Sequence, residues 1–303
     1  MKWRKLGFVW RPGGERAWAR RYAHVPTPER IGDSLVRVHF AALDERNFGR
    51  TASVDLDLRT LRVVGEDSEP RLDLGELGAF DDCGAVPSCI VRTEETLLYY
   101  IGFQRAERVP YMLFTGLARR DESTGRWLRV QRTPILDRTP EEPFSRAGAC
   151  VLAEGAAFRM WYWSCLRWEP GPAAPHYVNA LMHARSADGI VWHADASPLL
   201  LPDLPDEYAL GRPWVLRDAD RFRMWFSARS HSKGYAIGYA ESSDGLAWTR
   251  RDELAGIETS AEGWDSEMIC YPAVIDAGGR RFMFYNGNRH GATGFGVAVL
   301  EEG

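Results

Sequence analysis

Carboxylates gather directly ahead of two short apolar segments of the sequence. These stretches read FDDCGAVPS from Phe80 to Ser88 and GWDSEMICYP from Gly263 to Pro272. Cleavage of a glycosidic bond usually needs two carboxyl groups that flank the bond, one protonated as an acid and one ionised as a base or nucleophile. Carboxylates that lie close together push each other's pKa values apart, which suits this division. We therefore predict Asp82 and Glu267 as the acid and the base or nucleophile, in either order.

Other polar and aromatic residues stand near the same places. Asp265 and Glu207 belong to the predicted catalytic group, where they would tune the pKa values of the pair. Arg146 and Arg212 can hold a carboxylate or phosphate of a ligand by paired hydrogen bonds. The remaining residues predicted to contact the substrate are Asp81, Tyr208, Trp264, Arg21, His24, Asn288 and His290. The competing interpretation is that the acids cap turns or bind backbone amides, and that the polar loop residues form turns.

These residues occupy comparable positions because the sequence repeats itself about every sixty residues. The repeats contain the anchor segments HVPTPERI, AVPSCIVR, AGACVLAE, GRPWVLRD and CYPAVIDA. Five residues before the anchors stand Arg21, Asp82, Phe144, Tyr208 and Glu267. Thirteen residues after the anchors, second apolar segments close at His39, Tyr100, Tyr162, Phe226 and Tyr285. The chain therefore consists of five related units.

Each unit reads as short strands joined by turns, with no helical periodicity. Asp-Gly pairs at Asp188 and Asp244 indicate hairpin turns, and we place the tryptophans that follow them, Trp192 and Trp248, on outer strands. Four-stranded units repeated radially form a propeller. The sequence predicts an all-β fold with one domain over residues 1–303, a five-bladed β-propeller whose last blade is completed by the N-terminal segment KWRKLGFVW. Residues just before the innermost strands would ring one mouth of its channel.

Composition excludes several classes of function. The net charge of −4 with interspersed acids and bases argues against nucleic acid as a partner. No apolar run is long enough for a signal peptide or a membrane span, so we expect a cytoplasmic protein without a membrane partner. The five cysteines lack CxxC spacing, which indicates reduced thiols and no zinc site. No nucleotide, phosphate-loop or metalloprotease motif occurs, so we expect no metal and no cofactor.

The segments FDDCGAVPS, EYALGRPWV, FRMWFSAR, YAIGYAESSDGLAW, GWDSEMICYPAV and FYNGN together resemble a known pattern. It is similar to the five-bladed propeller proteins related to arabinanase, invertase and levansucrase. It resembles more closely the bacterial relatives of the N-terminal domain of glucosamine inositolphosphorylceramide transferases, which are often associated with polysaccharide or lipopolysaccharide biosynthesis. The resemblance spans nearly the whole chain and implies a propeller that handles carbohydrate.

This sequence departs from the catalytic pattern of the hydrolase group. That group has an aspartate in the first blade and another in an Arg-Asp-Pro context, whereas here the first inner strand carries Arg21 and His24, and Arg212 directly precedes Pro213. The family's catalytic residues are therefore not carried over to this chain.

Three hypotheses about function follow. The leading one is a glycoside hydrolase or transglycosylase-like enzyme that acts on a small sugar or an oligosaccharide. The alternative is a non-catalytic carbohydrate-binding propeller that assists polysaccharide or glycoconjugate biosynthesis, with a glycosyltransferase as its partner. A third is a propeller recruited to natural-product chemistry, since function belongs to the site and not to the fold.

Overall fold

The computed structural model describes residues 1–172 and 174–301, and nearly all of its regular structure is β-strand. The strands form successive antiparallel units that follow one another along the chain. The first unit contains β2 (Arg21–Arg30), β3 (Leu35–Leu43), β4 (Gly49–Asp57) and β5 (Arg62–Glu66). The second contains β6 (Gly84–Arg92), β7 (Thr96–Arg105), β8 (Tyr111–Arg120) and β9 (Trp127–Arg129). The third contains β10 (Arg146–Glu154), β11 (Ala157–Glu169), β12 (His176–Ser186) and β13 (His193–Ala194).

The C-terminal part of the chain continues the same order. The next unit contains β14 (Glu207–Arg217), β15 (Phe222–Ser230), β16 (Gly234–Ser242) and β17 (Thr249–Arg250), followed by the short helix η1 (Asp252–Leu254). The last contains β18 (Cys270–Ala277), β19 (Arg280–Asn286) and β20 (Phe295–Leu300), with α1 (Asn288–Gly291) between β19 and β20. The N-terminal strand β1 (Trp3–Trp10), predicted to complete this unit, pairs antiparallel with β20.

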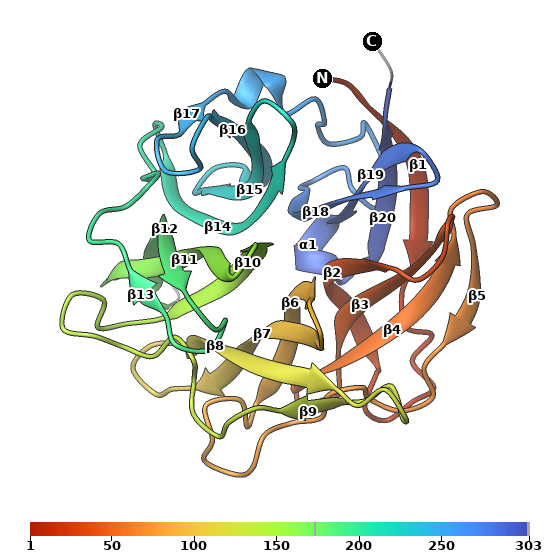
Figure 1. Cartoon of the computed structure of the whole chain (residues 1–303), viewed down its shortest axis with the longest axis horizontal. Coiled ribbons are helices and arrows are strands. Elements are labelled where there is room, and N and C mark those ends of the chain that lie inside the picture. The colour runs from red at the N-terminus through yellow and green to blue at the C-terminus, as the bar shows by residue number, and fades with distance from the viewer. Residues whose placement is uncertain (173, 302–303) are drawn as a thin grey trace.

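The units are arranged around a common centre, with β2, β6, β10, β14 and β18 innermost (Figure 1). Single parallel bridges join neighbouring units, for example between Gly49 of β4 and Gly84 of β6. The fourth and last units are linked by the backbone N–H of Ile269, which donates to the carbonyl of Tyr235. The last and first units are linked by Asn286, whose Oδ1 accepts from the N–H of Val25 at 2.8 Å. The innermost strands therefore surround the centre of the molecule.

The predicted Asp-Gly turns are present and are structural. Asp188 Oδ1 accepts backbone N–H bonds from Ile190 and Val191, and Asp244 Oδ1 accepts the equivalent pair in the following unit. The outer strands after these turns are shorter than predicted: Trp192 and Trp248 directly precede β13 and β17 and do not lie within them. Their indole N–H groups instead bond back to the turn carbonyls. The turns are therefore closed by their own side chains.

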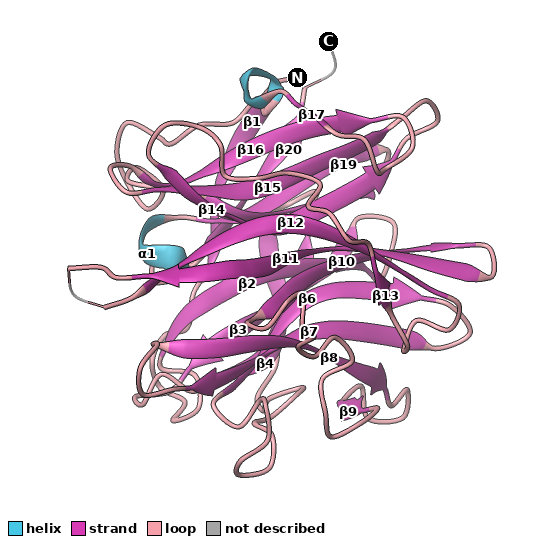
Figure 2. Cartoon of the chain, turned by 90° about the vertical axis from the view of Figure 1, so that its left-hand side faces the viewer, coloured by secondary structure: helices cyan, strands magenta, loops and turns pink. Residues whose placement is uncertain are grey.

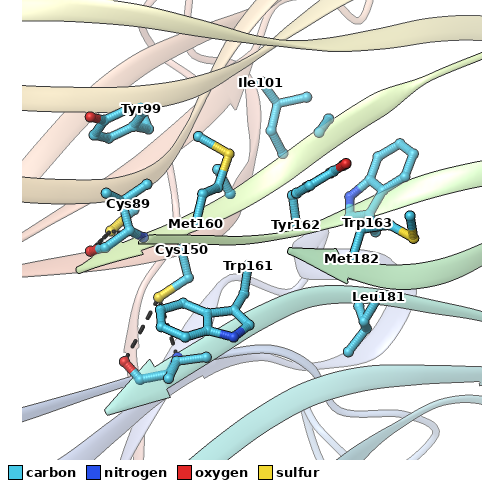
Figure 3. Packing of buried hydrophobic residues seen from close by; sticks show 14 of the residues in the cluster. Cys89, Tyr99, Ile101, Cys150, Met160, Trp161, Tyr162, Trp163, Leu181 and Met182 are labelled. Atoms are coloured by element: carbon cyan, nitrogen blue, oxygen red, sulfur yellow. Dashed lines mark hydrogen bonds between the residues drawn. The ribbon is translucent and has the colours of Figure 1, made fainter. Parts of the chain in front are cut away.

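The core consists of large aromatic and aliphatic side chains packed between units. Trp161 and Tyr99 are fully buried in one such cluster (Figure 3). Polar atoms of these rings bond across to the next unit's turn, Tyr99 to the carbonyl of Gly189 and Trp161 to that of Gly245. All five cysteines are free thiols. Within the described residues, no helix is both long and apolar enough to cross a bilayer.

Candidate functional site

A cavity of about 480 Å³ is lined by residues near the starts of the first and third strands of the units and near the ends of the second strands, for example Gly84, Tyr177 and Arg229. This volume falls within the range typical of small-molecule sites. The residues that line it with polar or aromatic side chains are Tyr22, His24, Asn47, Cys83, Phe103, Tyr111, Trp163, Tyr177, Asn179, Arg212, Arg229, Tyr235, Tyr271 and His290. Of the described residues that line it, none is an aspartate or a glutamate.

β-Bulges in the innermost strands aim side chains into this cavity. The residue before the anchor has a left-handed backbone in Val25 (φ 57°), Gly148 (φ 68°), Arg212 (φ 45°) and Tyr271 (φ 54°), next to a shift of strand register. Such a backbone is costly for side chains other than glycine, and strain of this kind clusters at functional sites. Gly148 leaves room for Trp163, because a Cβ atom at this position would lie only 2.4 Å from the indole Nε1. The bulges thus direct Val25, Arg212 and Tyr271 to the lining.

Arg212 is buried where the inner strands converge, and it is 2% exposed. Its Nη1 donates to the carbonyls of Tyr271 and Pro272, at 3.1 and 2.7 Å. Its Nη2 donates to the carbonyls of Pro26 and Ser88 and to Thr27 Oγ1. Burial lowers the pKa of Arg212 to about 10, so the guanidinium stays charged at neutral pH. One charged side chain of β14 therefore ties β2, β6 and β18 together.

Tyrosines surround a second guanidinium at the cavity wall, that of Arg229 on β15. Its Nη1 donates to the hydroxyl of Tyr177 at 2.8 Å, and that hydroxyl lies 2.9 Å from the hydroxyl of Tyr235. The guanidinium carbon lies 4.9 Å from the ring centre of Tyr235 and 5.3 Å from that of Tyr208. Tyr177 also stacks on Trp163, with ring centres 6.4 Å apart and planes 20° apart. These rings offer flat faces together with hydroxyl groups.

Two histidines complete the wall, His24 on β2 and His290 on α1. Helix α1 lies near the centre of the molecule in Figure 1 and at one of its faces in Figure 2. Burial, the neighbouring His290 and Arg212 lower the pKa of His24 to about 3. Burial and Arg229 lower the pKa of His290 to about 4. Both imidazoles are therefore neutral near pH 7.

The lowered pKa of His290 should make the folded chain sensitive to acid. As the pH falls below about 6.5, this histidine becomes protonated in the unfolded state, whereas in the folded state it stays neutral down to about pH 4. The free energy of unfolding therefore decreases as the pH is lowered from about 6.5 to about 4. Between pH 7 and pH 5 we expect the free energy of unfolding of wild type to fall by about 2 kcal/mol more than that of His290→Asn. Asparagine tolerates the left-handed backbone of this position (φ 59°).

Urea unfolding at both pH values measures this difference. His193→Asn, at an exposed histidine, is the control and should run parallel to wild type. Parallel profiles for His290→Asn and wild type would contradict the shift.

Three of the predicted acids lie outside the lining and are bound to other side chains. Asp81 is 1% exposed and accepts from Tyr100 Oη at 2.9 Å and Arg129 Nε at 2.7 Å. Asp265 is equally buried and accepts from Lys5 Nζ and Tyr285 Oη. Both oxygens of Glu207 accept from Arg250. Asp81 and Asp265 therefore fasten the segments before β6 and β18 to the second and outermost strands of their units, and Glu207 fastens β14 to β17.

The two residues predicted as the catalytic pair also lie outside the lining. Asp82 Oδ2 accepts from the N–H of Gly78, whereas its Oδ1 is buried with no partner among the described residues. Its neighbour Cys83 does line the cavity. Glu267 is exposed, and its backbone N–H donates to Asn288 Oδ1. The structure therefore places Asp82 beside the cavity and Glu267 at the surface.

Of the residues predicted to contact substrate, the cavity brings together His24, Arg212 and His290. Arg146 is buried in an ion pair with Glu142 at 2.7 Å, and Glu142 also accepts from Tyr162 Oη. This acid thus has an arginine and a tyrosine as partners, as Asp81 does in the second unit.

The remaining four lie elsewhere. Trp264 packs on Tyr285, with ring centres 5.1 Å apart. Arg21 is exposed and bonds to the carbonyl of Glu45, and Asn288 holds the backbone of Glu267 and Met268. Tyr208 stacks on His231 in a smaller neighbouring cavity.

Sequence reasoning missed the tyrosines and Arg229. Tyr177 and Tyr235 come from the start of β12 and β16, the third strands of their units, and Arg229 from the end of β15. The turns between second and third strands reach the same mouth as the approaches to the innermost strands, and only the last unit's turn, with Asn288 and His290, was among the predicted sites. The segments SARSHSKGYAIG and PHYVNA carry the missed signal, polar and aromatic residues at strand ends next to turns.

Comparison with known proteins gives the chain a family. No family model matches it. It is 40% identical over 304 residues to "Uncharacterized protein Rv1502" of Mycobacterium tuberculosis (strain ATCC 25618 / H37Rv), covering 99% of this chain and 100% of the relative. The chain belongs to the Rv1502 family. "Uncharacterized protein MT1551" of strain CDC 1551 / Oshkosh matches with the same identity and coverage.

Solved structures share the fold at lower identity. A "Glycoside hydrolase" superposes with a TM-score of 0.73 at 20% identity, covering 98% of this chain and 90% of that one. The alpha-L-arabinofuranosidase from Lactobacillus brevis gives 0.66 at 12% identity, with 93% and 91% covered. The endo-arabinase from Bacteroides thetaiotaomicron VPI-5482 gives 0.64 at 13% identity, with 98% of both covered. The Rv1502-family chain thus has the all-β fold of propeller glycoside hydrolases.

Proposed function

We propose that this chain is a five-bladed propeller whose central cavity binds a sugar or a sugar conjugate without cleaving it through a pair of carboxylates. The observation that carries the proposal is the lining itself. It combines aromatic faces, amide groups and guanidinium groups, and its described residues include no acid. Two carboxyl groups across the bond are what hydrolysis of a glycoside usually requires. The predicted acids Asp81, Asp265 and Glu207 are instead occupied by Arg129, Lys5 and Arg250.

Unsatisfied polar atoms in the wall support a polar ligand. Asn179 is 3% exposed, and its Oδ1 has no hydrogen-bond partner among the described residues. The same holds for Nε2 of His24. Buried polar atoms are normally paired, and leaving one unpaired costs about 1–3 kcal/mol. Sugar hydroxyls, which both donate and accept, would satisfy such atoms while the ring stacks on Trp163 or Tyr177.

Glycoside hydrolysis is the second candidate, and one observation favours it. Asp82 has a buried oxygen without a partner and adjoins Cys83 of the lining. In this alternative Asp82 and Glu267 serve as the acid and the base or nucleophile, as the sequence predicts. It requires Glu267, which is exposed here, to reach the bound sugar.

A thermal-shift screen against monosaccharides, sugar acids, sugar phosphates and aryl glycosides, with released aglycone measured in the same wells, separates the two functions. We expect at least one sugar to raise the melting temperature without release, because a ligand at 100 times its Kd adds about 2.7 kcal/mol of stability. Asn179→Leu should weaken that binding roughly tenfold. The control Asn47→Gly removes an exposed amide of the lining at a left-handed position (φ 62°), which glycine adopts without strain, and should weaken binding less.

Two results would contradict the proposal that the cavity binds a sugar without cleaving it. Release of aglycone that disappears in Asp82→Asn and Glu267→Gln would establish the hydrolase. If no sugar raises the melting temperature, the proposal of carbohydrate binding is wrong.

A further inference from the structure

We infer that the ligand of the central cavity carries an anionic group, a carboxylate or a phosphate, and that Arg229 binds this group. The inference rests on the proposed function and narrows its substrate class from sugars in general to acidic sugars or sugar phosphates.

The first step is the state of the Arg229 side chain. A guanidinium has five N–H donors, and among the described residues Arg229 makes one side-chain hydrogen bond, to Tyr177 Oη. It is half-buried against the rings of Tyr177, Tyr208 and Tyr235, and no described carboxylate forms an ion pair with it. Its remaining donors therefore have room for a ligand.

The contrast with other arginines that are buried or partly buried makes this state informative. Arg129 pairs with Asp81, Arg146 with Glu142, and Arg250 with Glu207. Arg212 lacks an acid but fills its Nη1 and Nη2 with backbone carbonyls and a hydroxyl. A charge held away from water usually needs a partner. Arg229 has aromatic faces in place of one.

The second step is the net charge of the whole wall. Arg212 and Arg229 contribute two positive charges, and no described lining residue contributes a negative one. His24 and His290, which face these two guanidiniums, are neutral near pH 7. Positive charge in a concave, partly desolvated wall attracts anions. A neutral sugar would leave that charge uncompensated.

The third step is that the wall offers two unlike ends. Asn179 contributes a neutral amide, whose oxygen has no hydrogen-bond partner among the described residues and which suits a hydroxyl group. Arg229 presents only donors, and its planar fork matches a carboxylate or phosphate. A ligand with a hydroxyl at one end and an acidic group at the other satisfies both. An acidic sugar or sugar phosphate has this form.

Calorimetric titration with matched ligand pairs tests the inference. The probes are glucose against glucuronate, galactose against galacturonate, and the 1-phosphates of both sugars, with inorganic phosphate alone as a further ligand. We expect at least one acidic sugar to bind tenfold or more tightly than its neutral parent. Preference for the uronate or for the phosphate identifies the source of the charge. The preference should shrink as salt rises from 20 to 300 mM, because salt screens charge interactions.

Variants assign the charge to Arg229. Arg229→Gln should weaken binding of the acidic sugar roughly 10- to 100-fold, which is the range expected for loss of a hydrogen bond to a charged group. Binding of the neutral sugar should weaken less than about twofold. Arg229→Lys keeps the charge without the fork and should lose less. Arg217→Gln removes an exposed arginine of β14 and should leave both affinities unchanged.

The outcomes separate the inference from the proposed function. If neutral and acidic sugars bind equally, or if the preference survives in a folded Arg229→Gln, the inference falls and sugar binding stands. If inorganic phosphate binds and no sugar does, carbohydrate binding falls. If no probe binds, both fall. Should Arg229→Gln fail to fold, the salt dependence of the wild-type preference decides alone.

Discussion

Arg212→Met is expected to destabilise the folded chain by roughly 3–5 kcal/mol, because it removes the donors of buried carbonyls and leaves those carbonyls unpaired. The five hydrogen bonds of this guanidinium reach residues of β2, β6 and β18 from β14, so the loss is shared by several units. The melting temperature should fall by about 10 °C. Differential scanning calorimetry of the unliganded protein measures it.

The matched variants for this substitution lie on the same strand. Arg217→Met removes a guanidinium that is 62% exposed and should change the melting temperature by less than about 2 °C. Arg212→Lys retains a charge but can reach fewer acceptors, so we expect an intermediate loss. A melting temperature of Arg212→Met equal to that of wild type would show that the convergence of the inner strands does not depend on this side chain.

Asp81→Asn is expected to destabilise the chain by roughly 2–4 kcal/mol while ligand affinity stays within about twofold of wild type. The carboxylate is buried, it accepts from Tyr100 and from Arg129, and the substitution leaves Arg129 without its negative partner. Burial and the nearby Asp81 charge raise the pKa of Tyr100, so its phenol stays protonated as the donor. Denaturant unfolding and ligand titration on the same sample measure both quantities.

Glu267→Gln is the control for that experiment, because Glu267 is exposed and its side chain has no hydrogen bond or ion pair that the structure describes. Its stability should match wild type within about 0.5 kcal/mol. The opposite pattern, in which Asp81→Asn keeps full stability but loses binding or turnover, would return the buried acids to a functional role.

The repeat, the strands and the turns could be predicted because their signals are local. Alternation of apolar residues marks a strand wherever it occurs, and Asp188 and Asp244 form their turns with atoms only two or three residues away. The pairing of the N-terminal strand with β20 could be inferred since the last repeat lacked a strand. The length of the outer strands could not, because the indoles of Trp192 and Trp248 compete for the same turn backbone.

Which of the candidate side chains line the cavity could be predicted only in part, for one physical reason. An acid next to a strand looks the same in sequence whether it faces a ligand or an arginine. Asp81 and Arg129 are 48 positions apart, and Asp265 meets Lys5 across 260 positions. The tyrosine cluster has the same character, since Tyr177 and Tyr235 touch across 58 positions. Contacts of this kind depend on how strands distant in sequence come together, within one unit for the two acids and between two units for the tyrosines.

The sequence by itself determined the all-β character, the repeated unit, the structural turns and the placement of His24, Arg212 and His290 near the centre, because these depend on spacing within one repeat. Only the tertiary structure decided which charges are satisfied. Convergence of the inner strands gives Arg212 its carbonyls, and the folding of each unit brings Asp81, Asp265 and Glu207 to the basic side chains of its outer strand. Arg229 is left among tyrosines at the cavity wall, because the contacts that neutralise the other arginines do not extend to its position.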